Sequence, residues 1–226
     1  MKLTYFGHSC FLLETGGSAL LFDPFLSQNP LAKTVDWKAI KPDFVLVSHA
    51  HYDHILDAEF FLKEHKSTLI SNFEIGNWML KKGEYQVIKM NLGARIQCPF
   101  GEVRMTASYH SSTLPDGSPG GNPGGFVIES QGSRLYFAGD TGLGPYLDFV
   151  GQHWSPDVAL LPISGRVTLD AEDAVLAAQL LKCQHVVGMH FDAFPELSID
   201  KDKTKAIFDQ AKIQLSLMNV GQTIQW

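Results

Sequence analysis

The sequence lacks several features that would place it in other classes of protein. Its 226 residues include only three cysteines, Cys10, Cys98 and Cys183. Their odd number and wide spacing favour reduced, partly buried thiols over a disulfide framework. No apolar run approaches the ~20 residues of a membrane span, and no apolar signal core precedes Gly7 and His8. We therefore expect a cytoplasmic protein with no membrane partner.

Positive charge is also in short supply. The chain has 18 Lys and Arg against 24 Asp and Glu, which gives a formal net charge of −6, and no basic cluster is longer than Lys81-Lys82. A nucleic-acid backbone requires a basic surface, so we expect no nucleic-acid partner. The composition, 45% hydrophobic and 19% charged, is ordinary for a globular protein. The simplest organisation is a single domain over residues 1–226, and the oligomeric state stays open.

What the chain does contain is a concentration of metal-binding side chains. Residues 49–54 read His-Ala-His-Tyr-Asp-His, which places four potential ligands in six positions directly after the apolar run 44–48. A strand that leads into such a loop can hold His49 and His51 side by side and turn the other two donors toward a second point. The alternative is a solvated polar loop that opens a helix, but four donors so close together after a buried strand favour a metal site.

Three more donors end apolar or β-prone runs elsewhere in the chain. They are His110 after residues 105–109, Asp140 after residues 135–139 and His190 after residues 186–189. Taken singly, each is more typical of a structural histidine or a turn residue. Because ligands gather beyond the carboxyl ends of strands in layered α/β folds, their shared placement predicts that four strands end at one site.

With these motifs in this order, the chain resembles a metallo-β-lactamase-fold hydrolase, in particular the small single-domain metal-dependent hydrolases related to the ascorbate-phosphate lactonases. The match runs the whole length, from Tyr5-Phe6-Gly7-His8-Ser9-Cys10-Phe11 and Asp23-Pro24-Phe25 through the 49–54 motif to Gly139-Asp140-Thr141 and Gly188-Met189-His190. The resemblance implies one divalent ion held by His49, His51 and His110, a second held by Asp53, His54 and His190, and a bridge between them formed by Asp140.

The resemblance also implies an α/β fold, the four-layer αββα sandwich of the metallo-β-lactamases. A coarse pass along the chain predicts strands near 2–6, 10–14, 18–22, 43–48, 67–71, 85–89, 93–97, 102–109, 125–130, 133–138, 157–162, 184–189, 213–218 and 222–225. Helices are predicted at 57–65, 73–82, 143–152, 171–182 and 201–211, with Asp170 as the cap of the fourth. Two mixed sheets with helices on their outer faces satisfy this pattern.

Two ions held ~3.5–4 Å apart can share a water, lower its pKa toward ~7 and present a bridging hydroxide to a carbonyl carbon or a phosphorus. We therefore expect a dinuclear hydrolase of a small-molecule ester, lactone, amide or phosphodiester. Zinc is the first expectation for the metal, but imidazole and carboxylate donors also accept Mn²⁺, Fe²⁺ or Ni²⁺. One alternative is an iron-dependent redox enzyme of the same fold, such as a sulfur dioxygenase, although His51 stands where diiron oxidoreductases usually have Glu. The other is a non-catalytic metal-binding scaffold.

Asp53, Asp140 and His8 are the expected catalytic residues. The resemblance implies that His8 faces the cavity and binds substrate or donates a proton to the leaving group, and a structural histidine is the alternative. Asp23 is either a turn residue before Pro24 or the acceptor that fixes the tautomer of a ligand histidine. No catalytic role is expected for the three remaining histidines, His65, His153 and His185. The glycine- and proline-rich residues 115–125 must form a loop, either a plain connector or a lid over the site.

Overall fold

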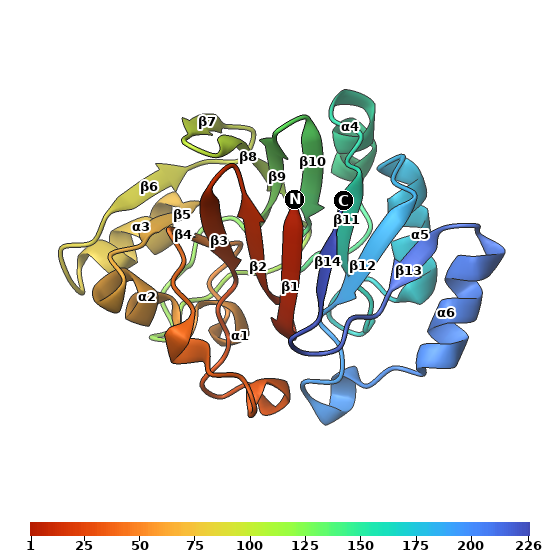
Figure 1. Ribbon diagram of the computed structural model, residues 1–226, viewed down its shortest axis with the longest axis horizontal. Coiled ribbons are helices and arrows are strands. Elements are labelled where there is room, and N and C mark those ends of the chain that lie inside the picture. Colours follow the sequence, from red (N-terminus) through yellow and green to blue (C-terminus); the bar gives the residue numbers. More distant parts are fainter.

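The computed structural model describes residues 1–226, whose strands form two seven-stranded sheets (Figure 1). In spatial order, the first sheet contains β14 (Thr223–Gln225), β1 (Lys2–Gly7), β2 (Cys10–Thr15), β3 (Ser18–Phe22), β4 (Phe44–Val47), β5 (Thr68–Asn72) and β6 (Val87–Met90). The second contains β13 (Gln214–Ser216), β12 (His185–Met189), β11 (Val158–Pro162), β10 (Ser133–Phe137), β9 (Gly124–Ser130), β8 (Gly101–Ala107) and β7 (Arg95–Cys98). Each sheet has an antiparallel part and a parallel part, which meet at β3 in the first sheet and at β10 in the second.

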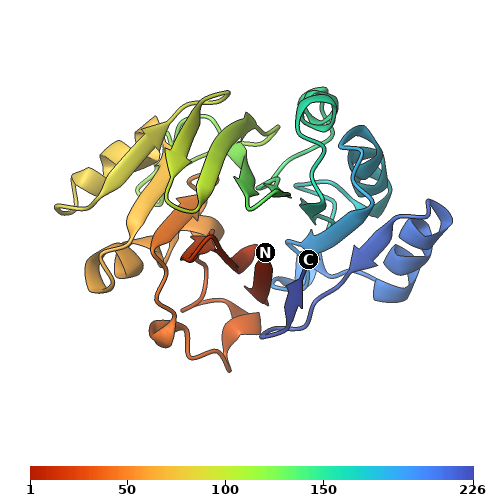
Figure 2. The same ribbon diagram turned by 45° about the horizontal axis from the view of Figure 1, so that its top comes forward.

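Helices cover the outer faces of both sheets (Figures 1 and 2). They are α1 (Tyr52–Ile55), α2 (Ala58–Glu64), α3 (Phe73–Leu80), α4 (Tyr146–His153), α5 (Ala171–Leu180) and α6 (Lys201–Gln210), with 3-10 turns η1 (Pro30–Ala32), η2 (Trp37–Ala39) and η3 (Pro195–Leu197). Helices α2 and α3 contact β4, β5 and β6, whereas α5 and α6 contact β11 and β13. This arrangement confirms the four-layer αββα sandwich.

The core lies between the two sheets and under the helices. The Phe22 ring of β3 stacks on the Phe137 ring of β10 with centroids 4.8 Å apart, so the inner faces of the two sheets are in direct contact. Every residue of β11 is buried, which explains its unbroken apolar sequence: a parallel strand covered on both faces has no solvent side. Each fully buried Leu or Phe of this core contributes ~1.5–3 kcal/mol relative to an exposed one.

The predicted strands and helices are all present, with differences mainly at their ends. Helix α4 begins at Tyr146 rather than at residue 143, because Pro145 occupies the position before the first turn. Residues 124 and 125 belong to β9, not to the preceding loop. A Cβ on Gly125 would lie 2.5 Å from the Phe137 carbonyl oxygen, so this strand position needs glycine. The four-residue helix α1 was not predicted, since it is too short to show a helical period.

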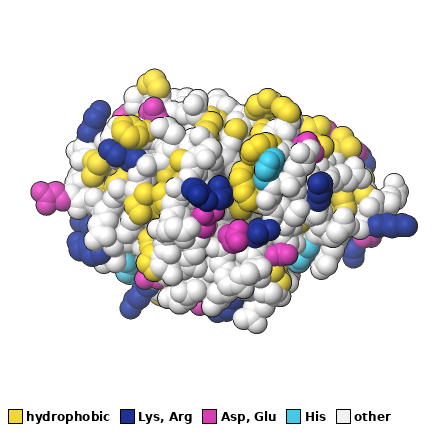
Figure 3. Space-filling view, turned by 90° about the horizontal axis from the view of Figure 1, so that it is seen from above, with side chains coloured by type: hydrophobic (Ala, Val, Ile, Leu, Met, Phe, Trp, Pro, Cys, Tyr) yellow, Lys and Arg dark blue, Asp and Glu magenta, His cyan; other side chains and the backbone are white.

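The sequence predicts free cysteines, no membrane-spanning segment and no basic surface. All three cysteines are free thiols, as predicted, with Cys10 and Cys183 buried. None of the helices combines the length and the apolarity that a membrane crossing requires. On the face seen in Figure 3, Lys and Arg side chains are interspersed with Asp and Glu rather than gathered in one stripe. The cytoplasmic location and the absence of a nucleic-acid partner stay predictions.

Candidate metal centre

The seven predicted donors converge beyond the ends of strands from both sheets. His49 follows β4 after one residue, His110 follows β8, Asp140 follows β10 and His190 follows β12 directly. The other three, His51, Asp53 and His54, lie at the start of α1. The parallel strands β4, β10 and β12 therefore deliver ligands at their carboxyl ends, as layered α/β folds generally do.

The short helix α1 divides the 49–54 motif into two halves. His51 precedes the helix with extended backbone angles, φ −63° and ψ 146°, and the chain turns into helical geometry at Tyr52. His49 and His51 lie close to His110, while Asp53 and His54 lie close to His190. One six-residue segment thereby supplies ligands to two separate groups.

Each group is tight enough to hold an ion. In the first, His51 Nδ1 lies 3.0 Å from His49 Nε2 and 3.2 Å from His110 Nε2. In the second, Asp53 Oδ2 lies 3.7 Å from both His54 Nε2 and His190 Nε2. Within each group, the potential ligand atoms all lie within 4.8 Å of one another.

Asp140 connects the two groups. Its carboxylate is buried, and Oδ2 lies near the Nε2 atoms of four histidines, at 2.9 Å from His190, 3.4 Å from His54, 3.5 Å from His110 and 3.9 Å from His49. Two of these histidines belong to the first group and two to the second. A single oxygen thus stands between both sets of donors.

Hydrogen bonds behind the site orient two of the histidines. Asp23 Oδ2 accepts from His54 Nδ1 at 2.7 Å and from the Ser48 hydroxyl at 2.6 Å. The same hydroxyl lies 2.9 Å from His49 Nδ1 and accepts a hydrogen bond from it. Because both Nδ1 atoms carry hydrogens, both Nε2 lone pairs face the centre, which is the arrangement that metal-binding histidines need. Of the two roles expected for Asp23, the structure favours the one that fixes a tautomer.

Serines perform the same task for two further ligands. The Ser111 hydroxyl lies 3.3 Å from His51 Nε2, and the Ser164 hydroxyl lies 3.3 Å from His190 Nδ1. His51 therefore directs Nδ1 toward the centre, whereas His190 directs Nε2. Sequence reasoning missed Ser48, Ser111 and Ser164, since serine is too common in loops to stand out.

His8 occupies a position that differs from the expected one. Its side chain is fully buried behind Asp53, and Nε2 donates to Asp53 Oδ2 at 2.9 Å. It does not line the cavity beside the metal centre. Asp53 and the ring of Phe194, 5.7 Å away between centroids, enclose the imidazole, so the geometry favours the structural role over contact with substrate or leaving group. Burial and the charge of His190 lower the pKa of His8 to about 4, so the ring is neutral at pH 7.

The electrostatics of the centre depend on proton sharing between the histidines and the carboxylates. Burial lowers the pKa of His190, but the Asp140 and Asp53 carboxylates outweigh it and raise that pKa to about 9. Burial raises the pKa of Asp140, but His190 and His54 outweigh it and hold that pKa well below its ordinary range. In the metal-free protein, protons on histidines thus provide the positive charge that offsets the buried Asp140.

The donor set fits divalent cations. His54 Nε2 and Asp140 Oδ1 are buried at the centre without any hydrogen-bond partner, and such an unmet polar atom costs ~1–3 kcal/mol. A bound cation would satisfy both and replace the histidine protons. Six nitrogen and carboxylate donors around one carboxylate suit zinc and also its divalent neighbours in the first transition row.

A cavity of about 420 Å³ opens onto this centre. Besides five of the predicted ligands, its wall contains Tyr52, Ser111, Arg166, Val167, Phe194, Glu196 and Leu197. Most of these come from the segments after β11 and β12. The sequence offers no signal for them, because no local pattern tells which loop will cover a site formed by distant strands.

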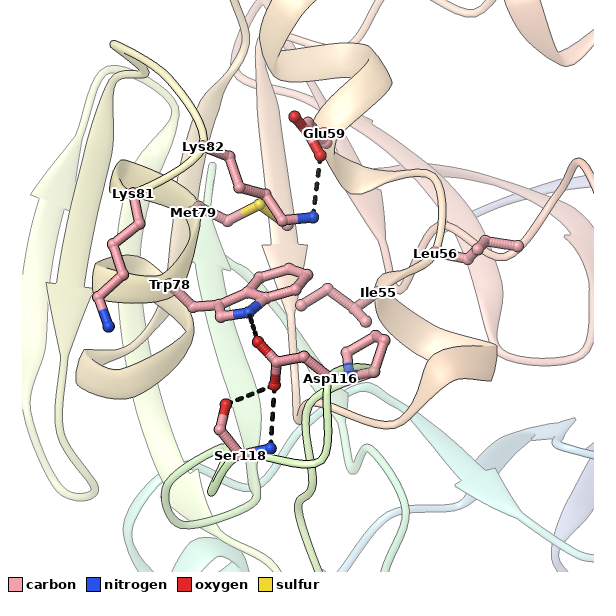
Figure 4. Close-up of a pocket in the computed structure, with 10 residues that line it drawn as sticks. Ile55, Leu56, Glu59, Trp78, Met79, Lys81, Lys82, Asp116 and Ser118 are labelled. Atoms are coloured by element: carbon pink, nitrogen blue, oxygen red, sulfur yellow. Dashed lines mark hydrogen bonds and ion pairs between the residues drawn. The ribbon is translucent and has the colours of Figure 1, made fainter.

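The glycine- and proline-rich loop packs against the 49–54 segment, where a Cβ on Gly120 would lie 2.2 Å from the Cβ of Ala50, but it does not line the cavity of the metal centre. Asn72 donates to the carbonyls of Gly120 at 2.7 Å and Asn122 at 3.0 Å, and Trp78 Nε1 donates to Asp116 Oδ2 at 2.6 Å. The loop thereby packs on α3 and helps to enclose a separate cavity of about 710 Å³, shown in Figure 4. None of residues 115–125 lines the cavity of the metal centre. The geometry favours the connector over the lid.

Comparisons with known proteins agree with this architecture. The family model described as Beta-lactamase superfamily domain matches residues 2–190. A UPF0173 metal-dependent hydrolase of Methylacidiphilum infernorum is 44% identical over 224 residues, with 99% of each chain covered. The solved structure of Igni18, a metallo hydrolase of Ignicoccus hospitalis, is 37% identical with a TM-score of 0.89 and covers 99% of this chain and 97% of its own.

A more distant structure extends the comparison of the fold. Isothiocyanate hydrolase from Delia radicum gut bacteria has a TM-score of 0.82 at 16% identity and covers 100% of this chain and 99% of its own. This likeness concerns the fold alone. The family model and the relatives of high identity show more: the chain is a metal-dependent hydrolase that belongs to the metallo-β-lactamase superfamily and, within it, to the UPF0173 family.

Proposed function

We propose that the protein is a dinuclear hydrolase that uses a metal-activated water to cleave a small ester, lactone, amide or phosphodiester. The observation that carries this proposal is the position of Asp140. Its Oδ2 lies within 3.9 Å of histidine nitrogens from both donor groups. A single-ion site would not need a buried carboxylate between two sets of three further donors.

The residues that would hold the ions are His49, His51 and His110 for one, Asp53, His54 and His190 for the other, and Asp140 for both. When bound, two such cations supply a water of lowered pKa as the nucleophile and a Lewis acid for the oxyanion that develops. The chain then needs no side-chain nucleophile. This agrees with the two buried cysteines, Cys10 and Cys183, which line neither described cavity.

Asp53 is the carboxylate best placed to move a proton. Its side chain is 22% exposed, whereas that of Asp140 is 2% exposed, so of these two carboxylates Asp53 is the more accessible to a leaving group in the cavity. The hydrogen bond from His8 Nε2 fixes the Asp53 carboxylate from behind. His8 thus acts through Asp53, as a positioning residue rather than as a proton donor to substrate.

The cavity sets a limit on substrate size. A volume of about 420 Å³ accommodates a small molecule but not a folded macromolecule. The isothiocyanate hydrolase that shares the fold adds isothiocyanates to the compounds worth testing.

A substrate panel with several metals tests the proposal. The metal-free protein is reconstituted with Zn²⁺, Mn²⁺, Fe²⁺ or Ni²⁺, and each form is assayed on chromogenic esters, lactones, amides, phosphodiesters and isothiocyanates. Hydrolysis that requires metal and is lost in Asp53→Asn supports the proposal. Oxygen consumption by the iron form without hydrolysis by any form would support the redox alternative instead.

A further inference from the structure

One cationic side chain on the cavity wall has no partner. The chain has four arginines, and each of the other three, Arg95, Arg104 and Arg134, lies within 3.5 Å of a glutamate oxygen. Arg166 forms no ion pair, and the wall of the metal cavity contains no lysine. Its guanidinium is therefore the only permanent positive charge that the protein presents to a molecule in this cavity.

The backbone holds Arg166 in an unfavourable conformation. Gly165 and Arg166 both have positive φ, 71° and 56°, within a turn closed by a 2.9 Å hydrogen bond from Gly165 N to Leu169 O. The left-handed region is uncommon for a residue with a Cβ, and residues held there concentrate at functional sites. The turn therefore projects Arg166 at some cost in conformational energy.

Both ends of this turn are attached to the metal centre. At one end, the Ser164 hydroxyl lies 3.3 Å from Nδ1 of His190. At the other, Leu169 N donates at 2.9 Å to the carbonyl of Thr141, the residue after Asp140. The backbone that carries Arg166 is thus anchored to the metal centre at both ends of the turn, while its exposed side chain is free to meet a bound molecule.

The rest of the wall favours a particular kind of molecule. Val167, which is 49% exposed, and Phe194 and Leu197 offer apolar surface. Glu196 is the only carboxylate on the wall outside the proposed ligand set, and it repels anions from its side of the cavity. An anionic group therefore has one favourable position away from the ions, at Arg166.

We infer that the substrate is a small organic anion whose carboxylate or phosphate group binds Arg166 while its scissile bond lies at the metal centre. The planar guanidinium matches both oxyanions with paired hydrogen bonds. Arg166 is then a specificity-determining residue. This inference rests on the proposed hydrolase function and adds the charge of the substrate to it.

Kinetics with paired esters provide the first test. Three 4-nitrophenyl esters of equal chain length, ending in methyl, carboxylate or phosphonate, are compared on the metal-loaded protein. We expect kcat/KM to be at least about tenfold higher for one of the anionic esters, and Arg166→Gln to abolish this preference mainly through KM. The better anionic ester tells carboxylate from phosphate. An equal kcat/KM on all three, or a preference that survives in Arg166→Gln, would overturn the inference.

A binding measurement separates this inference from the proposed function. Isothermal titration compares butyrate, succinate and 3-phosphonopropionate, in which one carboxylate is constant and the other end is varied. The wild type should bind a dianion at least about tenfold more tightly than butyrate, and Arg166→Gln should bind all three alike. If no ester is cleaved, the hydrolase proposal fails for esters, and this titration still decides the role of Arg166.

Two variants serve as controls. Arg166→Lys keeps the charge without the paired hydrogen bonds, so we expect it to retain part of the preference. Arg95→Gln removes an exposed arginine of β7 outside the cavity and should leave all constants unchanged. An effect of Arg95→Gln equal to that of Arg166→Gln would show that overall charge, not the subsite, is responsible, and would overturn the inference.

Discussion

Asp23 Oδ2 accepts a hydrogen bond from His54 Nδ1 at 2.7 Å, and neither side chain is exposed to solvent. Because this bond fixes the tautomer and orientation of His54, we predict that Asp23→Asn weakens metal binding by about 10- to 100-fold. Competition with a chromogenic chelator measures the dissociation constant. Asp36→Asn, at an exposed aspartate without a capping hydrogen bond, is the matched control. Equal affinities in the two variants would contradict the orienting role.

Asp140→Asn should keep the fold and lose turnover. The substitution keeps the shape of the side chain but removes the anionic charge that lies between the two donor groups. A loss of several kcal/mol of transition-state stabilisation corresponds to a reduction in kcat of about 100-fold or more. Steady-state kinetics with circular dichroism check both parts. His153→Ala, on α4 and outside the cavity, should behave like the wild type; near-normal turnover of Asp140→Asn with both ions bound would refute the bridging role.

Metal-free protein should respond to pH through His190. Burial lowers the pKa of this side chain, but Asp140 and Asp53 raise it from 6.5 to about 9. Protonated His190 therefore stabilises the fold fully below pH ~6.5, and this contribution is lost as the pH rises through about 9. The difference in unfolding free energy between the wild type and His190→Gln should shrink from pH 6 to pH 9.5. A difference that grows over this range would contradict the assignment.

The same proton competes with metal. Since a cation must displace it from His190, we predict that metal affinity rises with pH over the same window and that binding releases protons. Titration in two buffers of different ionisation enthalpy measures the number released. Binding that is independent of pH between 6.5 and 9 would mean that His190 is already deprotonated in the metal-free protein.

Substitutions of Asn72 distinguish whether the loop 115–125 is a connector or a lid. Its side chain caps α3 by accepting from Ile75 N and holds the loop through Gly120 and Asn122. Loss of the cap and of the tether should cost Asn72→Ala about 2–3 kcal/mol of stability. Asn72→Ser keeps a capping hydroxyl but not the tether. We expect faster proteolysis within the loop and an unchanged kcat/KM for both variants. A fall in kcat/KM with full metal content would instead support the interpretation of the loop as a lid.

The sequence predicted the donors better than their surroundings. His49, His110, Asp140 and His190 were recognisable because each ends an apolar run, and strand ends meet at one edge whatever the exact register. The burial of His8 was not predictable in this way. Gly7 and His8 both have positive φ, which turns the imidazole behind Asp53 instead of into the cavity.

The residues that line the cavity beyond the metal ligands could not be predicted from the sequence. Arg166 and Phe194 lie in segments separated by two helical or strand elements, and only the completed sandwich brings them to the wall of the same cavity. Their local sequences resemble ordinary turns. Specificity therefore resides in contacts that no short motif encodes.

The central claim is that the chain holds two divalent ions around Asp140. Elemental analysis of the folded, metal-reconstituted protein after removal of free metal tests it most directly. The arrangement of the donors predicts close to two divalent ions per chain. Folded protein that retains less than about half an ion per chain would contradict the dinuclear centre and the hydrolytic chemistry proposed for it.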